Sequence, residues 1–139
     1  MSLREMKKIV RNLELFKNKN DFNKITSFEA EVIRYIAKKN GITNKELSNY
    51  LYVDKALTSR TVKNLEKRGY VYFKEHLSDS RSKYIFSTKK GNDYKNIMVN
   101  IEEKYFFQIT KSLTNKELIE FEKLLEKIYT NSKNIRKAE

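Results

Sequence analysis

The sequence has no cysteine and no proline, and it has only one histidine and three glycines in 139 residues. Without a thiol, the chain cannot form a disulfide, a thiolate zinc site or a sulfenate that senses peroxide. A histidine-rich metal site is also excluded because His76 stands alone, and the spacing of the acidic residues indicates no carboxylate site. We therefore expect neither a metal nor another cofactor.

Enzyme chemistry is not indicated either. The glycines Gly41, Gly69 and Gly91 stand too far apart to form a phosphate-binding loop. No nucleophile with a neighbouring base and no pair of carboxylates suited to acid–base chemistry can be identified. The sequence predicts a protein that acts by binding and is not an enzyme.

The scarcity of proline and glycine predicts long helices, because neither residue is available to interrupt them. Apolar residues recur at helical spacing from Leu3 to Phe16, and the polar stretch 17–24 is predicted to be a loop. Charged residues are interspersed over 1–16, so this segment has neither a signal-peptide core nor a membrane span. The sequence predicts a cytoplasmic protein that does not bind a membrane.

Three more helices are predicted to begin at a threonine that is followed three residues later by a glutamate able to complete a capping box. These pairs are Thr26/Glu29, Thr43/Glu46 and Thr114/Glu117. The helix after Thr43 is short and ends near residue 51. Another helix is predicted from Asp54, as its cap, to Arg68, where Gly69 favours a left-handed end.

A β-hairpin is predicted next, because residues 70–76 and 84–87 are rich in β-branched and aromatic side chains and flank a polar, basic tip. From Thr88 an apolar stripe continues to Leu113, which predicts a helix of about 35 Å. A final helix carries the apolar residues between 118 and 128. We expect the polar tail beyond Thr130 to be frayed.

Positive charge is concentrated in one part of the chain. The 30 basic and 18 acidic residues give a net charge of +12, which favours a polyanionic partner such as nucleic acid or an acidic membrane surface. A lysine-rich composition would also follow from an AT-rich genome. However, residues 43–91 contain eight lysines and three arginines against five acidic residues, which is half of the net charge in about a third of the chain.

The same segment carries a family signature. VDKALTSRTVKNLEKRGYVYFKEHLSDSRSKYIFSTKKG, residues 53–91, resembles the core of MarR-family transcriptional regulators. The matching positions are Asp54, Ser59-Arg60, Val62, Leu65-Glu66, Arg68-Gly69, Val71, Asp79, Arg81, Thr88 and Gly91. Three positions depart from the family pattern: Phe73, where a basic residue is common, and Ser80 and Ser87, where arginine and leucine are frequent.

This resemblance implies a mostly α fold with a small β-hairpin, in a single domain of residues 1–139. A winged helix-turn-helix core would span 26–91, and the helical segments 1–16 and 92–139 would form a dimerisation region. The implied function is that of a homodimeric transcriptional regulator, most often a repressor, which binds a pseudo-palindromic operator in double-stranded DNA. Arg81 would enter the minor groove with Asp79 holding its guanidinium, and Lys83 would lie near phosphates. His76, near the hairpin tip, is interpreted as an ordinary strand residue.

The helix after Asp54 is predicted to have two different faces. Thr58, Thr61, Val62 and Leu65 share the inward face. The outward side chains are small, which allows close approach to bases, or cationic, which suits guanine acceptors and phosphates. A solvated helix face is the alternative, but the neighbouring helix and the basic hairpin favour DNA contact. The predicted DNA-contacting set is Lys55, Ala56, Ser59, Arg60, Lys63, Lys67, Asp79, Arg81 and Lys83.

The resemblance also allows a small-molecule inducer, bound between the dimerisation helices and the DNA-binding core. Phe16, Tyr105 and Phe106 are the candidates to line that pocket, although a helical stripe of aromatic residues is more often only core. A rival hypothesis is a winged helix that contacts protein or coats DNA without discriminating its sequence.

Overall fold

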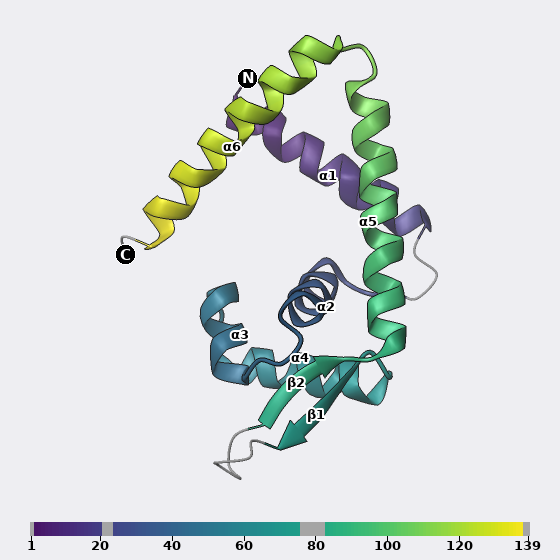
Figure 1. Cartoon of the computed structure of the whole chain (residues 1–139), viewed down its shortest axis with the longest axis vertical. Coiled ribbons are helices and arrows are strands. Elements are labelled where there is room, and N and C mark those ends of the chain that lie inside the picture. The colour runs from purple at the N-terminus through teal and green to yellow at the C-terminus, as the bar shows by residue number, and fades with distance from the viewer. Residues whose placement is uncertain (1, 21–23, 76–82, 138–139) are drawn as a thin grey trace. The chain divides into compact units, whose positions relative to one another are not determined.

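The described residues form six α-helices and one antiparallel β-hairpin (Figure 1). The structure is a computed structural model and describes residues 2–20, 24–75 and 83–137. In chain order the elements are α1 (Leu3–Asn20), α2 (Ser27–Lys39), α3 (Asn44–Leu51), α4 (Lys55–Lys67), β1 (Val71–Glu75), β2 (Lys83–Ser87), α5 (Lys89–Thr110) and α6 (Asn115–Lys137). The chain divides into two compact units, Met1–Glu102 and Glu103–Glu139, and α5 contributes to both.

All three predicted capping boxes are present. The Oγ1 atoms of Thr26, Thr43 and Thr114 each accept the N–H of the glutamate three residues later, at 3.1 Å. Each glutamate in turn accepts the N–H of its threonine, and at Thr114 these contacts hold the pKa of Glu117 below its ordinary value. Asp54 caps α4, with its Oδ1 2.6 Å from the nitrogen of Leu57. Local chemistry therefore sets where α2, α3, α4 and α6 begin.

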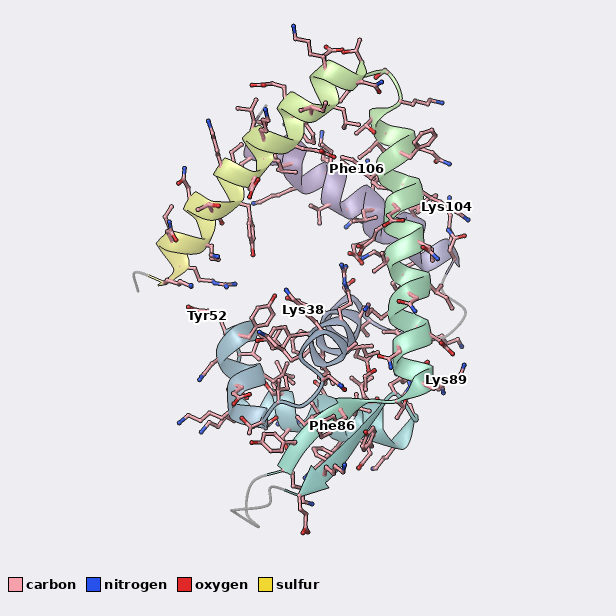
Figure 2. All side chains as sticks on the ribbon, viewed as in Figure 1. Lys38, Tyr52, Phe86, Lys89, Lys104 and Phe106 are labelled. Carbon is pink, nitrogen blue, oxygen red and sulfur yellow. The ribbon has the colours of Figure 1, made fainter. Side chains whose placement is uncertain are left out.

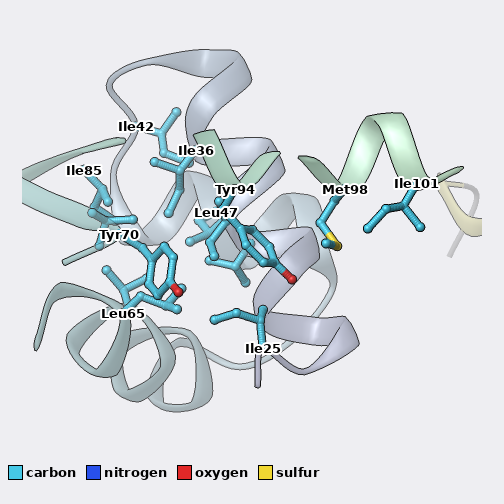
Figure 3. Packing of buried hydrophobic residues seen from close by; sticks show 14 residues of the cluster. Ile25, Ile36, Ile42, Leu47, Leu65, Tyr70, Ile85, Tyr94, Met98 and Ile101 are labelled. Atoms are coloured by element: carbon cyan, nitrogen blue, oxygen red, sulfur yellow. The ribbon is translucent and has the colours of Figure 1, made fainter. Parts of the chain in front are cut away.

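The core of the first unit lies where α2, α3, α4 and the hairpin meet α5 (Figure 3). Burial of branched apolar side chains from every one of these elements supplies most of the driving force that joins them. The side chains buried most completely are Val32, Ile33, Ile36, Leu47, Thr58, Val62, Leu65, Val71 and Ile85.

The hairpin pairs β1 with β2 in a register that runs from Val71 opposite Ser87 to Glu75 opposite Lys83. Its buried inner face includes Ile85, which also exchanges two backbone hydrogen bonds with Ile42, at 2.7 and 3.2 Å. On the outer face Phe86 (Figure 2) stacks on Tyr72 with ring centroids 5.4 Å apart. The two hydrogen bonds between Ile85 and Ile42 attach the hairpin to the segment that leads into α3.

Two predicted helix ends were wrong. α1 continues to Asn20 through part of the predicted loop, and in this extension Lys17 forms an ion pair with Glu102 on α5 at 2.5 Å. The Asn20 amide also donates to the Phe16 carbonyl, at 2.8 Å. α6 continues to Lys137 through the tail that was expected to be frayed. No proline or glycine interrupts that tail, and the basic residues of its last turn interact favourably with the helix dipole.

Glu29 is predicted to be a stabilising residue of the first unit, because its carboxylate uses both oxygens. Oε1 closes the capping box with Thr26 at 2.9 Å, and Oε2 lies 3.2 Å from the guanidinium of Arg68. Substitution Glu29→Ala should lower the free energy of unfolding by about 2 kcal/mol, because it removes a cap and the carboxylate that pairs with a half-buried arginine. Urea denaturation would measure the loss. Glu31→Ala, an exposed change on the same helix, is the control and should cost less than about 0.5 kcal/mol.

The second unit consists of the end of α5 together with α6. Within it Phe106 stacks on Phe121, with centroids 6.5 Å apart. No residue of α6 is buried. A helix that exposes its apolar stripe in this way needs a partner surface if it is to bury that stripe.

Candidate nucleic-acid interface

The helix pair α3–α4 is joined by only three residues, and local contacts set its turn. Tyr52 ends α3 in the left-handed conformation with φ of 56°, and the N–H of Val53 donates to the Ser48 carbonyl at 3.3 Å. The Asn44 side chain, at the start of α3, donates to the Lys55 carbonyl at 3.3 Å. The start of α4 is therefore tied to the start of α3, which gives a helix-turn-helix.

The two faces of α4 lie as predicted. Thr58, Val62 and Leu65 are buried, and Thr61 is half-buried. The hydroxyls of Thr58 and Thr61 donate to backbone carbonyls one turn earlier, at 3.0 and 2.9 Å, so neither is an unsatisfied polar group. On the opposite face Ser59 is half-buried, and the exposed residues are Lys55, Ala56, Arg60, Lys63 and Lys67.

The end of α4 is anchored by a polar junction. Arg68 contacts Glu29 and also donates to the Lys24 carbonyl, at 3.4 Å. The carbonyl of Arg68 accepts from the Lys90 ammonium at 2.7 Å, and the carbonyl of Gly69 accepts from the Thr88 hydroxyl at 2.6 Å. These contacts tie α4 to α2 and α5. Arg68 and Lys90 therefore serve to position the exposed face of α4.

A groove of about 870 Å³ lies between α4 and the hairpin. We call it the α4–hairpin groove. Its cationic lining consists of Lys45, Lys55, Lys63, Lys67 and Lys83, and Ser59, Phe73, Glu66 and Glu75 also line it. The ammonium of Lys83 lies 5.9 Å from the centre of the Phe73 ring. Lys45 was missing from the sequence-based set, because its place beside α4 depends on the packing of α3.

Some predicted residues cannot be placed. His76, Asp79 and Arg81 lie outside the described residues, so the minor-groove contact stays a prediction.

The candidate inducer pocket also stays a prediction: Phe16 packs against the core of the first unit, and Phe106 packs on Phe121 in the second. Neither they nor Tyr105 line the groove of about 650 Å³ on the first unit, where Tyr35 and Tyr50 stack at 3.6 Å.

The described residues contain no group of three acidic or histidine side chains close enough together to hold a metal ion. Among the helices described, none has both the length and the apolar character required to cross a membrane.

Comparison with known proteins finds a family match for part of the chain. Residues 25–83 match the sequence profile of the MarR family. The HTH-type transcriptional regulator BilQ of Clostridioides difficile (strain CD3) is 33% identical over 91 residues, which cover 66% of this chain. The matched part is 62% of BilQ, so it spans less than two thirds of that protein.

Solved structures share the fold along nearly the whole chain. Streptococcus pneumoniae FabT, in complex with DNA, has a TM-score of 0.84 at 21% identity, and the match covers 95% of each chain. An uncharacterized SlyA-like transcription regulator from Listeria monocytogenes has a TM-score of 0.77 at 26% identity, over 94% of this chain and 88% of that one. The chain therefore contains a segment, residues 25–83, that matches the MarR family, and it shares the fold of solved transcription regulators.

Proposed function

We propose that the protein is a sequence-specific transcriptional regulator, acting as a repressor, that binds a pseudo-palindromic operator in double-stranded DNA as a homodimer. One observation carries the proposal: the outward face of α4 presents Arg60, Lys63 and Lys67 on a rigidly joined helix-turn-helix, beside a lysine-lined groove. A helix with short and cationic side chains on its free face fits the major groove. FabT, with the same fold, was solved on DNA.

The dimer is supported by apolar residues left exposed in the second unit. Leu125, Tyr129 and Phe107 are 42%, 61% and 73% exposed. A second copy of the chain is the proposed cover, because an operator with two half-sites requires two reading helices about one helical turn apart. Residues 1–16 and 92–139 are the proposed dimerisation region, alongside a DNA-binding core at 26–91 in a single domain.

DNA as the partner implies a cytoplasmic protein that acts by binding and not by catalysis. We also propose that a small-molecule inducer binds non-covalently in a pocket that includes Phe16, Tyr105 and Phe106. An inducer would act by changing the spacing of the two α4 helices. A thiol-based signal is excluded by the absence of cysteine.

Arg60 and Lys63 are predicted to contribute differently to DNA binding. Arg60→Ala should weaken operator binding by about 1 to 3 kcal/mol and affect random DNA much less, because arginine can bridge guanine acceptors. Lys63→Ala should weaken both by a similar factor and reduce the salt slope by about one unit, because a lysine on phosphate releases counterions whatever the sequence. Footprinting upstream of the protein's own gene would locate the operator.

The measurement is a binding titration of each variant on operator and scrambled duplexes at two salt concentrations. Lys38→Ala, an exposed lysine on α2 outside the α4–hairpin groove, is the control and should leave both affinities unchanged. If Arg60→Ala and Lys63→Ala lowered both affinities by the same factor, the protein would coat DNA without discriminating its sequence, and the regulator proposal would fail.

A further inference from the structure

The α4–hairpin groove holds two carboxylates that DNA binding by its lysines does not explain. Glu66 lies near the end of α4, and Glu75 ends β1 opposite Lys83. Both side chains are exposed. Within the described part of the chain, neither carboxylate forms an ion pair or a hydrogen bond. Their charges are therefore available to act on whatever occupies the groove.

The proposed mode of binding decides what that occupant is. If α4 lies in the major groove and the hairpin reaches the adjacent minor groove, the sugar–phosphate strand that separates these two grooves must cross between α4 and the hairpin. The five lysines along that path attract the phosphates, and Glu66 and Glu75 repel them. Neither carboxylate forms an ion pair within the described residues, so each presents its negative charge to the groove.

We propose that Glu66 and Glu75 are affinity-limiting residues of the DNA interface, which weaken its hold on the phosphates of any duplex. The inference rests on the proposed DNA binding. Sequence-neutral binding depends almost wholly on lysine–phosphate contacts, so repulsion in this groove acts on its main source of affinity. Non-specific sites far outnumber the operator, so a weaker hold on phosphates leaves a larger share of the protein unbound at any moment.

The test replaces each carboxylate by its neutral isostere. Glu66→Gln and Glu75→Gln should each raise affinity about threefold to fivefold at low salt, by a similar factor on operator and on random duplex. The double variant should gain the product of the two factors. The gain should shrink as the salt concentration is raised, because counterions screen the repulsion. Glu31→Gln, on α2 outside this groove, makes the same change of charge and should alter neither affinity.

Each other outcome has a defined meaning. A variant that lowered operator affinity and left random DNA unchanged would mean that the carboxylate accepts a hydrogen bond from a base, which overturns the proposal. Unchanged affinity for both duplexes, in variants with wild-type circular dichroism, would also overturn it. Because the two residues lie on different elements, either variant tests the idea if the other fails to fold. A wild-type protein that bound neither duplex would instead defeat the proposed function itself.

Discussion

Replacing Leu125 by aspartate should convert the protein from a dimer to a monomer and abolish operator binding. Leu125 is 42% exposed on α6, a helix without a buried residue, and the proposed dimer would cover it. A carboxylate placed in that apolar contact would have to be desolvated without a partner, which costs several kcal/mol. In the proposed dimer each subunit would contact one half-site, so loss of the dimer would remove the gain from binding two half-sites at once.

Light scattering at micromolar concentration should give twice the chain mass of 16.7 kDa for the wild type and the single mass for the variant. Asn131→Asp makes the same change of charge at an exposed polar position of α6, and it should leave both mass and DNA binding unchanged. Circular dichroism would establish that the Leu125 variant keeps its helices. A monomeric protein with undiminished operator affinity would contradict the dimer proposal.

Replacing Gly91 by alanine should destabilise the first unit by about 2 to 3 kcal/mol and lower Tm by about 10 °C. A Cβ at this position of α5 would lie 2.3 Å from the Tyr70 carbonyl oxygen and 2.6 Å from the Ser87 hydroxyl. Alanine is intrinsically the better helix former by about 1 kcal/mol. The clash should outweigh this gain, because backbone at Tyr70 cannot move without disturbing the hairpin and the end of α4.

Gly69→Ala is the matched control. Gly69 has φ of +85°, and its added Cβ would meet only the flexible Lys90 side chain, at 3.7 Å. The expected cost is about 1 kcal/mol, from the left-handed conformation alone. Thermal unfolding of both variants should be compared at one protein concentration, because the proposed dimerisation would contribute to stability. If Gly91→Ala proved as stable as the wild type, the close packing of α5 on Tyr70 would be wrong.

Local chemistry in the sequence determined the helix starts and the two faces of α4. A threonine with a glutamate three residues on satisfies backbone donors within a single turn, so these boundaries need no distant contact. Likewise, the 3.6-residue period alone assigns Val62 and Leu65 to the core and Arg60 and Lys63 to the free face. The family signature in residues 53–91 then made DNA the expected partner.

The tertiary structure decided the features that depend on contacts between residues far apart in the chain. Beyond the predicted end of α1, Lys17 forms an ion pair with Glu102, 85 positions later in the sequence, and no local pattern indicates such a partner. The α4–hairpin groove likewise brings Lys45, Glu66 and Glu75 to one surface from three separate elements. Charges act through space and not along the chain, so only the packed fold could reveal which of them share a groove.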